Sequence, residues 1–265
     1  MPAVRPAAGA GIFYPNDAMP LRRQIGECLA AADAIVEAER PPKLLIVPHA
    51  GYVYSGAVAA RAYALLAPWR ERISRVVLLG PAHRSPVRAL AAPVAEAFDT
   101  PLGRIALDLP ALATLQDLPQ VARDDRPHAS EHSLEVQLPF LQTLLDGFEM
   151  VPLLVGHAGS AKVAQVLARL WGGDETLIVV SSDLSHYLPH AHAQLRDRAT
   201  VERILDFDAT LEPEDACGAL AINGALQSAR ANGLVPRLLD LRNSGDTAGD
   251  RRRVVGYTAI AFEAP

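Results

Sequence analysis

Three histidines in this chain each follow a short apolar run with the length of a buried strand. They are His49 after residues 43–47, His83 after residues 75–80, and His186 after residues 176–180. The carboxyl ends of parallel strands meet at one edge of an open α/β sheet, where loops converge and ligands bind. Because three unrelated surface histidines at that edge would be a coincidence, we expect them to share one site.

The residue types around these histidines indicate a transition-metal site. Neutral imidazole combined with carboxylate or thiolate suits Fe(II), Zn(II) or Cu, whereas calcium and magnesium require oxygen ligands. Cys217 is a candidate ligand because it lies near the predicted start of a helix, where free amides favour a thiolate. Its alternative role is that of a small buried apolar residue.

Asp183 stands three residues before His186 and is expected to fix or charge-match that ring during proton transfer. Glu131 and His132 lie in a polar loop, where they could join the site or cap the helix that follows. Ser181 and Ser182 do not predict a serine nucleophile, because the Gly-x-Ser-x-Gly turn is absent.

The elements that position these residues predict an α/β fold with a mixed central sheet flanked by helices. Strands and helices alternate along most of the chain. Residues 87–107 read as short strands that leave the main sheet, and the last two strands make the sheet mixed. Helices are expected at residues 21–39, 133–145, 161–171, 191–207 and 214–229. No linker or repeat divides the chain, so we predict one domain, residues 1–265.

Composition excludes several classes of function. The net charge of −5 and the absence of a basic stripe argue against nucleic acid as a partner. No apolar run reaches the length of a membrane span, and no signal-peptide pattern opens the sequence. The two cysteines lie far apart, which fits a reducing compartment. We therefore expect a cytoplasmic protein that contacts neither membrane nor nucleic acid.

Five ordered motifs resemble those of the Memo family, whose bacterial members are called AmmeMemoRadiSam system protein B. They are Pro48-His49-Ala50-Gly51-Tyr52-x-Tyr54-Ser55-Gly56, Gly80-Pro81-x-His83, Glu131-His132-Ser133-Leu134-Glu135-x-Gln137-Leu138-Pro139-Phe140, Ser181-Ser182-Asp183-Leu184-Ser185-His186 and Cys217-Gly218. The resemblance spans most of the chain, from the segment 11–15 to residues 255–257.

This resemblance implies a fold similar to that of class III extradiol dioxygenases, which open catechol rings with non-haem Fe(II). It implies that His49, His83 and Cys217 hold the metal and that His186 is the catalytic acid or base, with Asp183 beside it. Family members often have cysteine where Ser185 stands, which argues against a second pocket thiol here. Animal members are linked to metal binding, redox signalling and phosphotyrosine-peptide recognition.

We therefore predict a metal-dependent redox enzyme that acts on a small aromatic or related substrate. Fe(II) is the first choice of metal, and Cu or Zn would also suit the ligands. The predicted metal ligands are His49, His83 and Cys217, and the predicted catalytic residues are His186, Asp183 and His132. One alternative is a non-catalytic protein that binds a metal or a phospho-ligand or peptide in the same pocket. Another is a zinc hydrolase with His186 as base. The family resemblance also suggests a functional link to a radical SAM protein.

Overall fold

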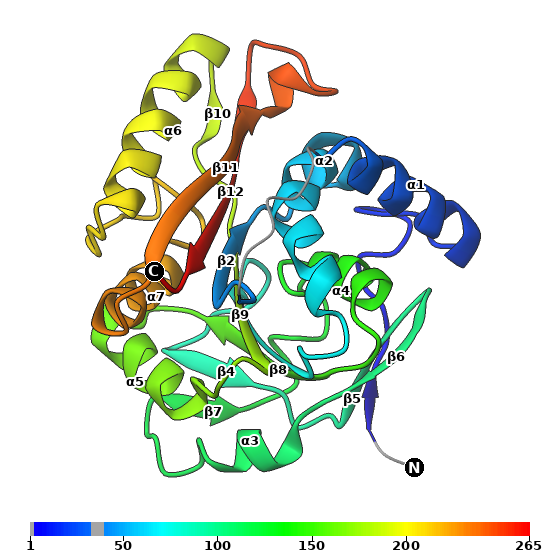
Figure 1. Cartoon of the computed structure of the whole chain (residues 1–265), viewed down its shortest axis with the longest axis vertical. Coiled ribbons are helices and arrows are strands. Elements are labelled where there is room, and N and C mark those ends of the chain that lie inside the picture. Colours follow the sequence, from blue (N-terminus) through cyan, green and yellow to red (C-terminus); the bar gives the residue numbers. More distant parts are fainter. Residues whose placement is uncertain (1–2, 33–39) are drawn as a thin grey trace.

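A mixed β-sheet forms the centre of the molecule in the computed structural model, which describes residues 3–32 and 40–265 (Figure 1). Its strands are β2 (Leu44–Val47), β3 (Arg75–Pro81), β4 (Leu90–Ala92), β7 (Val121–Arg123), β8 (Glu149–Val155), β9 (Thr176–Ser181), β10 (His186–Leu188), β11 (Val235–Asn243) and β12 (Val254–Glu263). The spatial order is β10-β12-β2-β9-β3-β8-β4-β7, with β11 also paired to β12. The central strands β2, β9, β3 and β8 run parallel, whereas β12 and β4 are antiparallel to their neighbours β2 and β8.

Helices cover both faces of this sheet, which confirms the predicted α/β class. Within the described residues they are α1 (Ala18–Ala30), α2 (Tyr52–Tyr63), α3 (Leu109–Ala113), α4 (Leu138–Leu144), α5 (Ser160–Leu170), α6 (His190–Leu205) and α7 (Ala219–Ala231). Short 3-10 turns occupy Ala64–Trp69, Glu135–Gln137 and Ser244–Asp246. Helix α2 packs on β2 and β12, while α7 packs on β3 and β9 with α5 beside it. None of the helices described is long and apolar enough to span a lipid bilayer.

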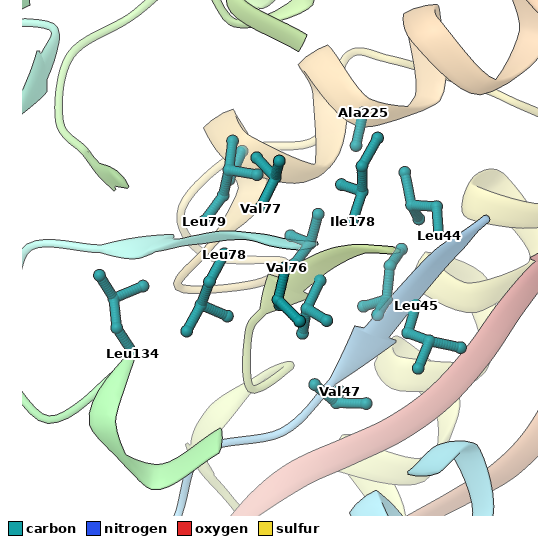
Figure 2. Packing of buried hydrophobic residues seen from close by; sticks show 14 of the residues in the cluster. Leu44, Leu45, Val47, Val76, Val77, Leu78, Leu79, Leu134, Ile178 and Ala225 are labelled. Carbon is teal, nitrogen blue, oxygen red and sulfur yellow. The ribbon is translucent and has the colours of Figure 1, made fainter. Parts of the chain in front are cut away.

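The central strands are apolar without interruption because helices bury them from both sides. Successive side chains alternate between the two faces, as Figure 2 shows. Leu44, Val77, Leu79 and Ile178 face α7 near Ala225, while Leu45, Val47, Val76 and Leu78 face the other way. All eight side chains of the strands are fully buried. Each contributes about 1.5–3 kcal/mol of hydrophobic stabilisation, so the strand ends that carry the polar residues are held on a rigid base.

A second, small sheet lies outside the central one. It joins β1 (Val4–Arg5) to β5 (Ala97–Thr100), which pairs with β6 (Gly103–Ala106). The predicted departure from the main sheet is therefore confirmed for β5 and β6 but wrong for β4. Strand β4 is fully buried and pairs antiparallel with β8, where its apolar residues extend the main sheet.

Helix boundaries differ from the predicted ones in three places. Helix α1 ends at Ala30, and the predicted continuation at residues 33–39 lies outside the described residues. The predicted helix 133–145 is divided into a 3-10 turn and α4, whose first turn contains Pro139. The predicted helix 214–229 begins only at Ala219, because Asp215 bonds to the backbone of Glu212 and ends a turn there.

Candidate metal centre

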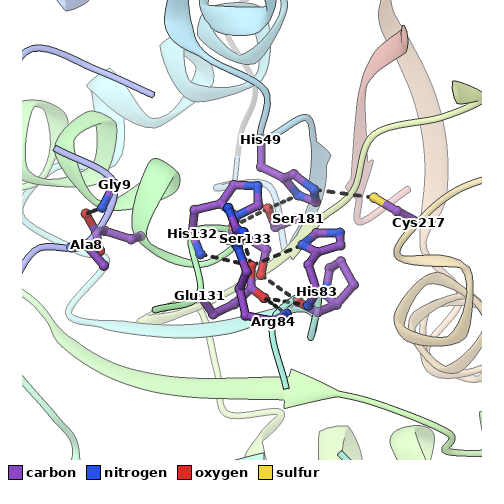
Figure 3. Close-up of polar contacts among 12 residues, drawn as sticks. Ala8, Gly9, His49, His83, Arg84, Glu131, His132, Ser133, Ser181 and Cys217 are labelled. Atoms are coloured by element: carbon purple, nitrogen blue, oxygen red, sulfur yellow. Dashed lines mark hydrogen bonds and ion pairs between the residues drawn. The ribbon is translucent and has the colours of Figure 1, made fainter. Parts of the chain in front are cut away.

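Three histidine rings gather at the carboxyl ends of the parallel strands. One ring nitrogen each from His49, His83 and His132 lies within 4.8 Å of the other two. The ring centroids are 5.1 to 5.5 Å apart. The three side chains come from the loops after β2 and β3 and from the polar loop before the 3-10 turn at residues 135–137. Figure 3 shows the group with the polar residues that hold it.

Strand register places His49 against the end of β9. Val47 pairs with Ser181, so His49 and Asp183 each lie two residues beyond a matched pair. The backbone N–H of His49 donates to Asp183 Oδ1 at 2.8 Å, and its ring Nδ1 lies 2.9 Å from Ser181 Oγ. The His49 side chain is buried, with an exposed fraction of only 2%. Both ends of the residue are thus fixed by the neighbouring strand.

The partners of Ser181 determine which nitrogen of His49 carries the proton. The Ser181 hydroxyl donates its only proton to the carbonyl of Ser133 at 2.6 Å. It accepts from Gln137 Nε2 at 2.7 Å, so the remaining bond requires His49 Nδ1 to be the donor. Nε2 of His49 therefore keeps its lone pair. Burial lowers the pKa of His49 to about 4, so the ring is neutral at neutral pH.

A single carboxylate, that of Glu131, orders the other two histidines. It accepts the backbone N–H groups of His83, Arg84, His132 and Ser133 at 2.5, 3.3, 2.9 and 2.9 Å. It also accepts Nδ1 of the His83 ring at 3.0 Å, and Nδ1 of His132 lies 3.1 Å from the same oxygen. Burial alone would raise the pKa of Glu131, but the hydrogen bonds from His132, His83 and Ser133 hold it well below its usual range. Because Nδ1 of His83 is bonded to this carboxylate, Nε2 of His83 is the nitrogen that is left to bind a metal.

The histidine group opens into a cleft of about 590 Å³. Its lining includes aromatic side chains, namely Phe13, Tyr54, Tyr187 and Tyr257, and the charged residues Asp183, Asp250 and Arg253. Tyr187 has φ 62, in the left-handed region that bulky residues rarely adopt. Such backbone strain is typical of ligand sites. The cleft is large enough for a small organic molecule.

Cys217 contacts this group from one side without being part of it. Its Sγ lies 3.3 Å from Nε2 of His49 and accepts the backbone N–H of Asp183 at 3.3 Å. Burial, followed by the charge of Asp183, raises the pKa of the Cys217 thiol to about 12. This burial opposes the thiolate that a nearby helix start favours, and the role of Cys217 as a metal ligand stays a prediction. Cys217 stands two residues before α7, and burial outweighs the pull of its amides.

His186 and Asp183 both line the cleft, but the expected contact between them is missing in the described part of the chain. Asp183 is buried and bonds to the backbone of His49, whereas His186 is exposed beside Tyr187. The carboxylate that His186 influences is that of Asp197 in α6. Burial raises the pKa of Asp197 to about 6, while its bond to Ser185 and the charge of His186 lower it.

Sequence reasoning missed the supporting residues of the site. The sequence predicts no nucleophile at Ser181, and the position of Ser181 beside His49 follows from strand register, which the sequence does not specify. Phe13 stacks on His132 from a distant amino-terminal arm. His128, in the same polar loop as Glu131, is buried with 2% exposure, and its ring donates to the carbonyl of Ala91.

Comparison with known proteins identifies the family of this chain. A family model described as "Memo-like protein" matches residues 5–261. The chain belongs to the Memo family. A MEMO1 family protein of Aquifex aeolicus is 34% identical over 98% of this chain and 99% of its own length. One from Methanopyrus kandleri is 36% identical over 97% of this chain and 98% of its own. One from Aeropyrum pernix is 38% identical over 81% of both chains.

Family membership and the three-histidine group together establish a Memo protein with a cluster that is compatible with a metal ion. The motifs that resemble the family in sequence are the same segments that build this site. Three of them supply the histidines of the group, and a fourth supplies Ser181 and Asp183, which fix His49.

Proposed function

We propose that this Memo protein is a metal-dependent oxidoreductase that acts on a small aromatic or related substrate. The observation that carries the proposal is the convergence of three ring nitrogens within 4.8 Å at one end of a cleft. Neutral imidazoles with a carboxylate as outer partner fit a transition metal and not calcium or magnesium. Fe(II) is our first choice because of the likeness to extradiol dioxygenases that the motifs imply, and Cu or Zn remain alternatives.

Two of the proposed ligands, His49 and His83, are those that the sequence predicted. For the third, geometry favours His132 over Cys217. A nitrogen of His132 lies in the group with both other rings, whereas Cys217 approaches only His49. Three protein ligands would leave positions open for substrate, the arrangement typical of catalytic rather than structural metal sites.

A bound Fe(II) would supply the redox chemistry with oxygen that protein side chains lack. The protein's own residues would orient the substrate and move its protons. Phe13 and Tyr54 offer aromatic surfaces to a planar ring, and His186 lines the same cleft, where we propose it as the proton-transfer group. The Asp183 carboxylate accepts the backbone N–H of His49. We therefore assign Asp183 a positioning role.

Protein purified without air tests the proposal. Metal analysis should give one transition-metal ion per chain, and oxygen consumption should appear when catechols are added to the Fe(II)-loaded protein. The variant His49→Ala should lose both the bound metal and the oxygen consumption. Protein that binds no transition metal would overturn the proposal. Protein that binds metal but consumes no oxygen with any diol would favour the second candidate.

That second candidate is a non-catalytic metal or phospho-ligand binding protein, with a small molecule or peptide as ligand. The guanidinium of Arg253 lies over the Tyr187 ring, 4.9 Å from its centroid, in the same cleft. Asp250 in the same cleft is already bonded to Arg252, so the charge of Arg253 is available to an anion.

Cytoplasmic location and a link to a radical SAM protein remain proposals that accompany either function.

A further inference from the structure

A second cleft, of about 690 Å³, lies apart from the histidine group and shares none of its lining residues. Its lining includes residues of β4, of β7 and of the first turn of α5. These elements lie toward the lower left in Figure 1. Its floor is apolar and buried, with Val87, Leu90 and Ala91. A volume of this size is typical of sites for small organic ligands.

The charged side chains of this cleft are mostly basic. Arg88, His157 and Lys162 line it, and among the described contacts none of their side chains has a hydrogen-bond or ion-pair partner. The acidic residue there, Asp124, is already neutralised, because the Arg126 guanidinium bonds both its oxygens. Those bonds lower the pKa of Asp124 to about 2. The cleft therefore presents uncompensated positive charge over an apolar floor.

The backbone holds these basic groups in place. Beyond the paired strands β4 and β8, the N–H of Gly156 donates to Ala89 at 2.7 Å and that of His157 to Val87 at 3.2 Å. Only glycine at position 156 permits the two segments to come this close, since a Cβ there would lie 1.8 Å from the Val87 carbonyl oxygen. Arg88 and His157 thus stand on two neighbouring, hydrogen-bonded segments.

Helix α5 contributes Lys162 to this cleft, and no other residue of the helix lines it. Lys162 lies in the first turn of α5, which has no acidic residue that would offset its charge. An arginine fork and a lysine ammonium are together donors that suit a tetrahedral dianion.

We propose that this cleft binds a small organic phosphate, with the phosphate between Arg88 and Lys162 and the organic part on the apolar floor. The site is independent of the metal centre and of the function proposed for it. The loop from His83 to Arg88 connects the two clefts, with its first residues held by Glu131.

Calorimetric titration of the full chain with phenyl phosphate, benzoate and phenol at low salt tests this proposal. Phenyl phosphate should bind most tightly and phenol most weakly. The double variant Arg88→Gln/Lys162→Gln should bind phenyl phosphate at least about tenfold more weakly, because it loses both charged hydrogen-bond donors to the phosphate. A matched control, Arg22→Gln/Arg23→Gln, removes two exposed charges from α1 and should bind as the wild type does.

The variant Arg253→Gln separates the two clefts, because Arg253 is the cation of the histidine cleft that is available to an anion. Unchanged phenyl phosphate affinity in this variant supports the second cleft. Loss of binding there places the ligand in the histidine cleft and overturns the proposal. Equal affinity in the Arg88/Lys162 variant and its control, or absence of binding to the wild type, also overturns it. Both double variants change exposed side chains, and circular dichroism should confirm that they fold.

Discussion

The ring of Phe13 stacks on that of His132, with centroids 4.0 Å apart and planes 10° from parallel. Phe13 belongs to an amino-terminal arm whose backbone is tied to α2, since Tyr52 N–H donates to its carbonyl at 2.8 Å. The same arm is anchored by Glu135, a fully buried carboxylate. It pairs with Arg5, accepts the Tyr14 hydroxyl, and accepts the N–H groups of Ala8 and Gly9 at 2.8 and 2.7 Å. The arm therefore forms one wall of the histidine site.

Replacing Phe13 by alanine should weaken metal binding while the protein stays folded. An aromatic stack contributes about 0.5–1.5 kcal/mol, so the metal affinity should fall by roughly two- to tenfold as His132 loses its support. Titration against a competing chelator measures this. Ile12→Ala is the matched control, because its side chain is 75% exposed. An affinity for Phe13→Ala equal to that of the control would show that the stack does not position His132.

The identity of the third ligand can be decided by two variants. If His132 is the ligand, His132→Ala should lose metal as fully as His49→Ala, whereas Cys217→Ser should retain most of it. Both variants should be compared after anaerobic loading with Fe(II). Full retention by His132→Ala together with loss by Cys217→Ser would restore the set of His49, His83 and Cys217.

Glu131→Gln should weaken metal binding without removing a ligand. The amide keeps the shape of the carboxylate but cannot accept all the N–H groups that converge on it, so His83 and His132 lose their orientation. Loss of such an outer partner costs about 10–100-fold in metal affinity. Glu214→Gln, on the exposed turn before α7, controls for the charge change. Equal affinities in the two variants would contradict the ordering role of Glu131.

Much of the fold and the histidines of the site could be predicted because they depend on local pattern. Buried strands read as apolar runs, and His49 and His83 follow such runs directly. Strand register cannot be read in the same way. It determines that Ser181 meets His49 and that Asp183 bonds to the backbone of His49 rather than to His186.

Long-range packing explains the remaining errors. Phe13 and His132 are far apart in sequence, and nothing in either segment indicates that their rings meet. Cys217 falls inside the predicted helix 214–229 but precedes α7 in the structure, and its burial there raises the pKa of its thiol. Strand β4 belongs to the main sheet because β8 offers it a partner, which composition alone does not reveal.

His186→Ala should retain metal but lose turnover. The side chain is exposed in the cleft and is not a member of the three-histidine group, so the ligands should not move. Metal content and oxygen consumption with a catechol should be measured on the same preparation. His192→Ala, an exposed change in α6, is the control. If His186→Ala is empty of metal after the same loading, its separate catalytic role must be abandoned.

The buried ring of His128 should make the fold less stable as the pH falls. Burial lowers its pKa to about 4 in the folded protein, whereas an unfolded histidine has a pKa of about 6.5. Between these values the unfolded chain binds a proton that the folded chain does not, so stability is present above pH ~6.5 and is lost toward pH ~4.

The size of the effect follows from the two pKa values. From pH 7 to pH 5 this group alone should remove about 2 kcal/mol from the free energy of unfolding. His128→Gln keeps a donor for the carbonyl of Ala91 but cannot titrate, so its stability should fall by about 2 kcal/mol less over that range. Urea unfolding of both proteins at the two pH values measures the difference. His192→Gln should behave as the wild type. An identical pH dependence in His128→Gln and wild type would mean that His128 takes up its proton equally well in the folded and in the unfolded chain.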